Sequence, residues 1–172
     1  RSQLGERRRV TVACCGLAGV DGGSGAPRGL DVEVLSEALA GLRELVSAKV
    51  EPLGGSLGGL LGGLVWFYFG HPQAREDDAQ RAVRVARALI AQVERLGLPN
   101  PAGRPWRLAV SIAIHTGPAV VSHRPDGAAE LQLGSTLDLA AGLQRVTAPG
   151  SVVVSAESCP LVARGFALEA LE

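Results

Sequence analysis

The distribution of hydrophobic and polar positions changes several times along this chain, and each pattern predicts a different element. Residues 9–15 (RVTVACC) alternate and are rich in β-branched side chains, which predicts a strand. Residues 16–28 are rich in Gly and include a Pro, so we expect a loop there. Leu35, Leu39 and Leu42 recur at helical spacing, which predicts a helix that begins near Asp31 and ends before the breakers at residues 52–55.

Residues 52–71 carry no charge and allow two interpretations. Gly pairs recur every four residues, at 54–55, 58–59 and 62–63, as in the small-residue packing face of a membrane helix. The alternative is a β-hairpin with strands at residues 56–60 and 64–69 and a tight turn at Gly62 and Gly63. The pattern favours the hairpin, because the sequence VWFYF at residues 65–69 is typical of a strand.

The second half of the chain continues the alternation of helices and strands. An acidic start at residues 76–78 followed by the apolar stripe from Ala82 to Val93 predicts an amphipathic helix. We expect a strand at 107–114, a turn at 115–118, a return strand at 119–122, a strand at 130–133, a helix at 135–145 that opens with a Ser135–Asp138 capping box, a strand at 151–154, a short helix at 155–163 and a last strand at 166–171. This order predicts an α+β fold, with a ferredoxin-like βαββαβ core and a C-terminal β/α extension.

Composition narrows the classes of function. The 172 residues suit one domain, and 17 basic residues balance 17 acidic ones, so we expect neither a nucleic acid partner nor a membrane partner. An aromatic content of 3% also argues against stacking platforms for single-stranded nucleic acid. Three Cys residues exclude a disulfide framework. The chain contains no Met and opens with Arg1, so we expect residues 1–172 to be a single domain from a longer, cytoplasmic protein.

Residue chemistry alone does not predict a catalytic site. The Gly-rich run lacks the Gly-Lys-Ser/Thr ending of a phosphate-binding loop, since Leu64 follows Gly63. Cys14 and Cys15 are adjacent on a strand, so their side chains should face opposite sides rather than share a metal. His71 and His115 are interpreted as turn residues.

Four stretches of the chain form a recognisable set. They are ERRRVTV at residues 6–12; YFG at 68–70 with EDDA at 76–79 and RAVR at 81–84; IHTGP at 114–118; and LAA at 139–141 with LQ at 143–144 and PGSV at 149–152. Together they resemble the class III adenylate/guanylate cyclase homology domain. The match has the right order and spacing and covers nearly the whole chain. The resemblance implies a cyclase-like sandwich, the hairpin interpretation of residues 52–71, and sites formed across a dimer interface.

The resemblance also implies six active-site positions, none of which holds the residue type that the reaction needs. The two aspartates that bind Mg²⁺ or Mn²⁺ in such enzymes fall on Gly16 and Gly63, and the purine-reading Lys and its polar partner fall on Gly59 and Leu131. The Asn that orients the ribose falls on Asp138, and the Arg that neutralises the transition state falls on Gly142. Because Gly supplies neither ligand nor charge, we expect no cofactor and no catalysis.

Three functions stay open on this basis. The favoured one is a degenerate domain that acts as a dimerisation or regulatory module in an intracellular signalling protein, as a homodimer or a heterodimer, with fused kinase or ATPase modules suspected. The second is an active cyclase with relocated metal ligands among Asp126, Glu130 and Asp138. The third is a small-ligand sensor that uses the vacated cleft.

Overall fold

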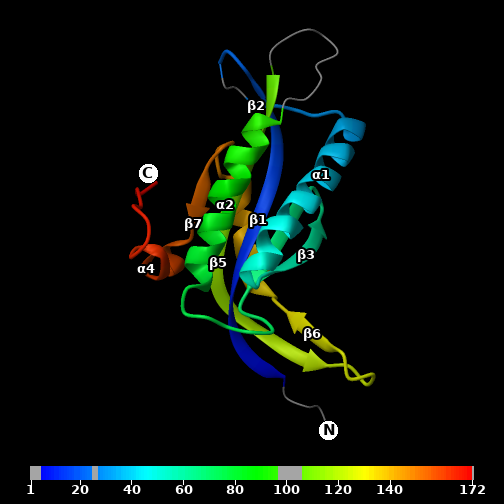
Figure 1. Cartoon of the computed structure of the whole chain (residues 1–172), viewed down its shortest axis with the longest axis vertical. Coiled ribbons are helices and arrows are strands. Elements are labelled where there is room, and N and C mark those ends of the chain that lie inside the picture. Colours follow the sequence, from blue (N-terminus) through cyan, green and yellow to red (C-terminus); the bar gives the residue numbers. More distant parts are fainter. Residues whose placement is uncertain (1–4, 25–26, 97–105, 172) are drawn as a thin grey trace.

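The computed structural model describes residues 5–24, 27–96 and 106–171 and arranges them around one twisted sheet (Figure 1). The strands follow the order β3-β4-β1-β5-β6, with β2 beside β1 and β7 beside β5. All pairings are antiparallel except that of β5 with β7. The strands are β1 (Glu6–Asp21), β2 (Pro27–Arg28), β3 (Ser56–Leu61), β4 (Leu64–Phe69), β5 (Trp106–His123), β6 (Ala129–Gln132) and β7 (Val152–Val154).

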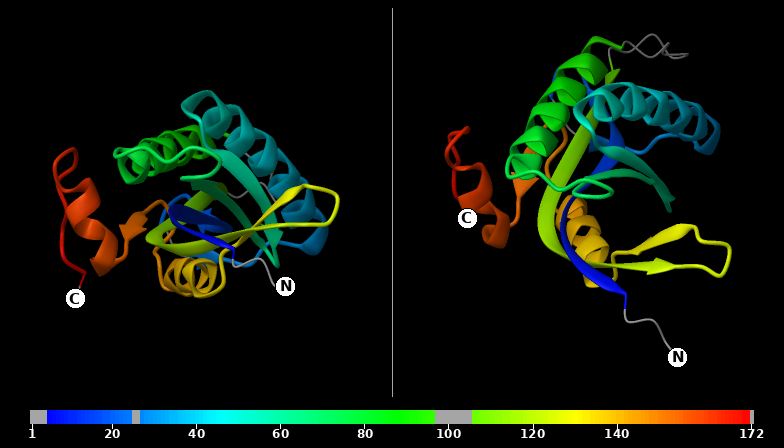
Figure 2. Two further views of the ribbon diagram at one scale, coloured as in Figure 1. Left: turned by 90° about the horizontal axis from the view of Figure 1, so that it is seen from below. Right: turned by 60° about the horizontal axis from the view of Figure 1, so that its bottom comes forward.

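Helices cover both faces of the sheet. The helices are α1 (Val32–Val50), α2 (Asp78–Arg95), α3 (Ser135–Arg145) and α4 (Cys159–Val162), and the short 3-10 turns are η1 (Glu51–Leu53) and η2 (Ala156–Ser158). Figure 2 shows α1 and α2 side by side on one face and α3 on the other. The predicted βαββαβ core is confirmed, because β1, α1, β3, β4, α2 and β5 follow one another in the chain and β1 lies between β4 and β5.

Alternation along β1 divides the core into two clusters. Cys15 and its odd-numbered neighbour Ala13 pack against α1 and α2, whereas Cys14 and Val12 pack on the α3 side. The expectation that the two thiols face opposite sides is therefore confirmed. Burial raises the pKa of Cys14 to about 12, so this thiol is protonated and unreactive at neutral pH.

The uncharged segment forms the predicted hairpin. β3 and β4 pair through a tight turn at Gly62 and Gly63, and Gly62 has the positive φ of 59° that such a turn requires. The membrane-helix alternative is wrong for these residues. Across the described parts of the chain, no helix combines the length and the apolar character needed to cross a bilayer.

β1 and β5 are much longer than the sequence pattern predicts. β1 continues through the expected loop at residue 16 to Asp21, and β5 runs without a break through the expected turn at residues 115–118. All of β1 pairs with β5, from Glu6 opposite Val121 to Asp21 opposite Trp106. This pairing supplies hydrogen-bond partners that outweigh the weak strand propensity of Gly16 and Gly117.

Three smaller predictions need correction. The N-cap of α3 is Gly134 and no side-chain cap bond forms, so Ser135 and Asp138 do not make a capping box. The predicted short helix at residues 155–163 is a 3-10 turn followed by four helical residues. The described residues 166–171 form no strand, because they lie beyond β7 with no neighbouring strand to pair with.

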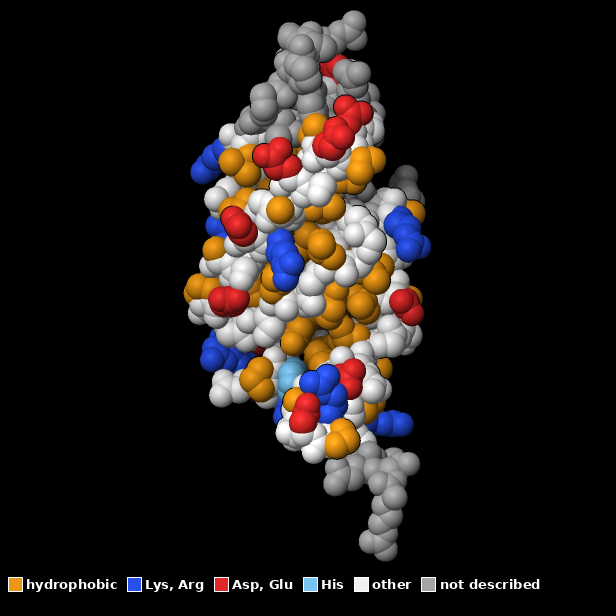
Figure 3. All heavy atoms as spheres, turned by 90° about the vertical axis from the view of Figure 1, so that its right-hand side faces the viewer, with side chains coloured by type: hydrophobic (Ala, Val, Ile, Leu, Met, Phe, Trp, Pro, Cys, Tyr) orange, Lys and Arg blue, Asp and Glu red, His pale blue; other side chains and the backbone are white. Residues whose placement is uncertain are grey.

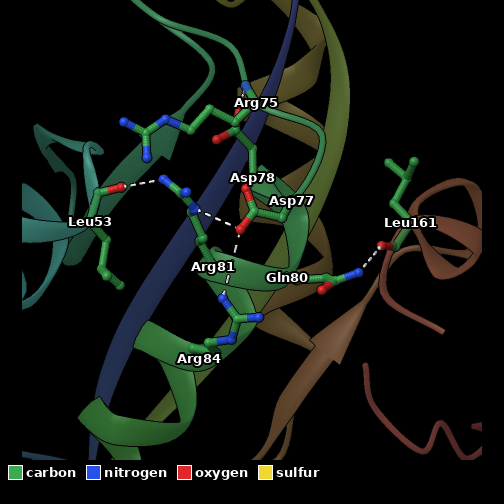
Figure 4. Close-up of polar contacts among 8 residues, drawn as sticks. All are labelled: Leu53, Arg75, Asp77, Asp78, Gln80, Arg81, Arg84 and Leu161. Atoms are coloured by element: carbon green, nitrogen blue, oxygen red, sulfur yellow. Dashed lines mark hydrogen bonds and ion pairs between the residues drawn. The ribbon is translucent and has the colours of Figure 1, made fainter. Parts of the chain in front are cut away.

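Polar side chains at the start of α2 attach this helix to the residues that precede it, as Figure 4 shows. Arg81 donates from Nε to Asp77 Oδ2 at 3.0 Å and from Nη1 to the Leu53 carbonyl at 2.7 Å. The backbone N–H of Arg75 donates to Asp78 Oδ2 at 2.8 Å. Arg81 therefore joins α2 to the connection between α1 and β3.

Candidate functional site

The six positions that the resemblance assigns to an active site lie on four parts of the fold, which are β1, the β3–β4 hairpin, β6 and α3. Gly16 is opposite Leu64 in the pairing of β1 with β4, so Gly16 and Gly63 are close neighbours. Asp138 and Gly142 are one helical turn apart on α3. Gly59 lies on β3 and Leu131 on β6. The structure thus brings together the two positions for metal ligands, as the resemblance requires.

Gly16 is buried beneath the side chain of Gln144 from α3. A Cβ atom built on Gly16 would lie 2.8 Å from Gln144 Cδ and still closer to Nε2. Gln144 Nε2 donates to Ser111 Oγ at 2.7 Å, and Ser111 is opposite Gly16 on β5. Gln144 and Ser111 are 8% and 7% exposed, so the amide fills the space into which a side chain at position 16 would point.

The hairpin positions differ from each other. Gly59 follows an irregularity in the pairing of β3 with β4 and has a φ of 130°, a conformation that disfavours any larger residue. A Lys at this position would therefore strain the backbone. A Cβ on Gly63 would meet no atom within 4 Å, so this position has room for a side chain.

The positions on α3 and β6 differ from Gly16 and Gly59. Gly142 is half-buried, and a Cβ there would also meet no atom within 4 Å. Asp138 is exposed in the first turn of α3, where its charge suits the helix dipole. Leu131 is half-buried and makes an apolar contact with the α3-side core cluster.

The carboxylates of the described residues form no cluster that could hold a metal ion. Within the described ranges, no three or more His, Cys, Asp and Glu side chains gather into a group that could hold a metal ion. Asp126 accepts hydrogen bonds from Arg124 at 3.3 Å and from the Ala128 N–H at 2.9 Å, so it is engaged in its own turn. The donor set near Gly16, an amide and a hydroxyl that bond to each other, does not fit Mg²⁺, which is usually bound through carboxylates.

The structure contains a buried polar network at His115 that the sequence analysis does not predict. His115 is 5% exposed within β5, and its Nδ1 lies 2.7 Å from Ser155 Oγ. Ser155 Oγ lies 2.8 Å from Ser158 Oγ, which accepts a 2.7 Å hydrogen bond from the Thr116 N–H. Burial lowers the pKa of His115, whereas the nearby Glu157 carboxylate acts to raise it. This network attaches the C-terminal extension to the sheet.

The sheet face beside α3 is only partly covered. Leu64, Trp66 and Tyr68 of β4 pack against the α3-side core cluster while staying half-exposed, and Leu61, opposite Leu64, is 40% exposed. The Trp66 and Tyr68 ring centroids are 5.7 Å apart. We call these four residues the open sheet face. Figure 3 shows hydrophobic side chains gathered on this side of the molecule, above the charged tip where β5 turns into β6.

A separate cavity of about 420 Å³ lies between α1 and α2. Its lining includes Leu17, Leu42, Leu45, Val93 and Leu108 and is mostly apolar. None of the six active-site positions lines this cavity. It is therefore separate from the six positions that the resemblance assigns to an active site.

No protein-family model matches the chain, and no curated protein matches it. Solved structures do match. The guanylyl cyclase domain of the RhoGC fusion protein from the aquatic fungus Blastocladiella emersonii, in a monomeric double-mutant form, is 16% identical, with a TM-score of 0.75 over 99% of this chain and 92% of that one. A non-canonical dimeric form of that domain has a TM-score of 0.73 at 17% identity over 97% of this chain and 90% of that one. The adenylyl cyclase CyaB from P. aeruginosa is 22% identical, with a TM-score of 0.70 over 93% of this chain and 83% of that one.

At these identities the likeness concerns the fold. The chain has the fold of adenylyl and guanylyl cyclase catalytic domains over nearly its whole length. The architecture expected from the sequence resemblance is therefore confirmed.

Proposed function

We propose that this domain is a catalytically degenerate cyclase homology domain that acts as a dimerisation or regulatory module. The proposal is supported by the combination of a cyclase fold with the residue types at the six positions that the resemblance assigns to an active site, none of which is the type that the reaction needs. Gly16 and Gly63 offer no carboxylate to a cation, and Gly142 offers no charge to a transition state. Loss of an Arg that contacts developing phosphoryl charge alone costs roughly 10³–10⁵ in rate.

A partner subunit does not restore such a site. According to the resemblance, one half of a composite site supplies the two metal carboxylates, and the other half supplies the Lys, Asn and Arg. This chain lacks both sets, so neither a homodimer nor a heterodimer with an active cyclase completes a site that uses its residues. The role that fits these residues is binding rather than chemistry.

A direct assay tests this proposal. The purified domain is incubated with ATP or GTP and with Mg²⁺ or Mn²⁺, and the adenylyl cyclase CyaB serves as the positive control. We expect no cyclic nucleotide above the protein-free background, because Gly16 and Gly63 supply no carboxylate to a cation. Metal-dependent turnover that scales with the concentration of the domain would contradict the proposal and favour relocated ligands.

Dimerisation is the binding activity that the surface supports. The open sheet face exposes aromatic and aliphatic side chains beside α3, and a second copy can cover such an apolar surface. A guanylyl cyclase domain with the same fold is known both as a monomer and as a non-canonical dimer, so the fold is compatible with dimers without requiring them. The partner is a second copy of this chain or another cyclase-like domain, within a larger cytoplasmic signalling protein that carries further modules such as a kinase or ATPase.

A further inference from the structure

The first half of α1 packs less closely against the domain than the second half. The buried residues of α1 all lie in its second half, and they are Leu42, Val46 and Val50. The first half contributes apolar side chains that stay half-buried, such as Val34 and Ala38. A helix that packs along its whole length buries an apolar residue at every turn. The cavity of about 420 Å³ lies where this packing is incomplete, since both Val34 and Ala38 line it.

Small residues of α1 leave this cavity open. Ala38 and Gly41 are three positions apart on one face of α1, and both line the cavity. A Cβ on Gly41 would meet no atom within 4 Å, so the space beside this residue is unfilled in the described structure. Leu17 of β1, Leu45 of α1 and Val93 of α2 form part of the walls. The cavity therefore has walls from the sheet and from both helices.

The chemistry of the lining restricts what can occupy the cavity. Water inside it would find few hydrogen-bond partners, because most of the lining residues are apolar. Glu37 and Gln92 are the polar side chains among the described lining residues. Glu37 is exposed, so its carboxylate lies where the cavity meets solvent and repels an anionic ligand. Gln92 is half-buried and can form a hydrogen bond with a polar group of a ligand.

We propose that the cavity between α1 and α2 is a binding site for an uncharged, largely apolar small molecule. Its volume lies within the range of about 300–1,000 Å³ that is typical of small-molecule sites. Burial of apolar ligand surface against side chains such as Leu42 and Leu108 drives the binding. The inference goes beyond the proposed function and does not depend on it, because none of the six active-site positions lines the cavity.

Fluorescence titration with a matched pair of dyes tests the ligand class. N-phenylnaphthylamine is uncharged, and anilinonaphthalenesulfonate has the same aromatic skeleton with an added sulfonate group. The uncharged dye should bind saturably, bind more tightly than the sulfonate, and raise the melting temperature of the domain. Glu37→Gln should reduce the difference in affinity between the two dyes, because it removes the repelling carboxylate.

Filling the cavity tests where the uncharged dye binds. Gly41→Leu places a side chain in the open space and should weaken binding by about tenfold or more, without lowering the urea midpoint of unfolding. Ala48→Leu adds a Leu to an exposed position of α1 outside the cavity and is the matched control, which should bind like the unaltered chain. Leu61→Glu, on the open sheet face, should also leave the dye affinity unchanged. If Gly41→Leu lowers the urea midpoint, the smaller substitution Ala38→Val provides the same test.

Three results would overturn this proposal. They are no binding of the uncharged dye, equal affinity of the unaltered chain and the cavity-filling variant, and loss of binding only in Leu61→Glu, which would place the dye on the open sheet face. Tighter binding of the sulfonate would contradict the assigned ligand class. The cyclase assay tests the proposed function alone, so failure of that function and failure of this inference are distinguishable.

Discussion

Some glycines in this domain leave no space for a larger side chain, whereas others lie in open space. A Cβ on Gly58 would overlap the indole ring of Trp66, which lies against the β3 backbone. A Cβ on Gly142 would meet nothing within 4 Å, although this residue lies inside α3. The sequence shows only that glycine is abundant, and the structure shows which glycines leave room for a neighbour.

This difference predicts opposite effects of the same substitution. Gly142→Ala should stabilise the domain by roughly 0.5–1 kcal/mol, because Ala restricts the unfolded chain and has a higher helix propensity. Urea unfolding measures the effect. Gly41→Ala, in open space within α1, is the matched control and should stabilise similarly. A loss of stability in both variants would contradict the account.

Gly58→Ala should act in the other direction. The added methyl group forces Trp66 away from β3, and overpacking of this kind costs about 1–3 kcal/mol. Gly63→Ala is the control on the same hairpin, because its Cβ has open space and its φ is not in the left-handed region. The comparison needs only the two free energies of unfolding, and equal values would count against the described position of Trp66.

At the scale of elements, the sequence predicts what local pattern determines and fails where distant strands decide. The periodic helices and the β3–β4 hairpin follow from residues close together in the chain. The lengths of β1 and β5 do not, because Gly16 and the HTGP run at 115–118 are held in strands by pairing with residues about a hundred positions away. The buried hydrogen bond from Gln144 to Ser111 has the same origin, since it joins α3 to a strand residue 33 positions away.

The contacts of Arg81 make a prediction about the attachment of α2. Arg81→Ala removes its hydrogen bonds to Asp77 and to the Leu53 carbonyl and should cost about 1–3 kcal/mol. Arg84 lies 3.9 Å from the same carboxylate with its side chain 53% exposed, so Arg84→Ala should change stability by less than about 1 kcal/mol. Thermal unfolding of the two variants compares a bridging Arg with a surface Arg, and similar losses would contradict the described role.

The His115 network predicts a pH dependence of the C-terminal extension. Burial holds the pKa of His115 below its ordinary value of 6.5, so the unfolded chain binds a proton at a pH where the folded chain does not. The contribution of neutral His115 to the stability of the fold is therefore complete above about pH 6.5, and it is lost as the pH decreases toward the folded-state pKa. The melting temperature of the wild-type domain should decrease between about pH 7.5 and about pH 5.

Substitution of His115 separates its contribution to the pH dependence from the contributions of other groups. His115→Gln should make the decrease smaller, with the remainder due in part to His71, whose pKa burial also lowers. Arg81→Ala serves as a control for destabilisation alone and should keep the wild-type pH dependence. An unchanged pH profile in His115→Gln would remove His115 as the titrating group.

At the scale of the whole molecule, two surfaces of the sheet meet different environments. One face is covered by α1 and α2 (Figure 2). The other face is covered by α3 only in part, and its uncovered part is the open sheet face. The apolar residues that stay exposed beside α3 support the proposal that a second polypeptide covers them.

Light scattering with two leucine variants tests that proposal. The wild-type domain should have the mass of a dimer at tens of micromolar concentration, and Leu61→Glu should give monomers, because it buries a charge in the interface. Leu168→Glu is the matched control, since Leu168 is 43% exposed, close to the 40% of Leu61, but lies in the C-terminal segment. A wild-type monomer, or equal effects of the two variants, would contradict the assigned surface.

The uninterrupted pairing of β1 with β5 has a mechanical consequence. Sixteen residues of β1 at about 3.3 Å each give a ribbon roughly 50 Å long, which runs along the longest axis of the domain (Figure 1). A pull on the chain before Glu6, directed along this ribbon, loads its hydrogen bonds in shear, so that many resist together rather than breaking one by one. We therefore expect the domain to resist stretching along this axis more strongly than it resists peeling of β1 from one end.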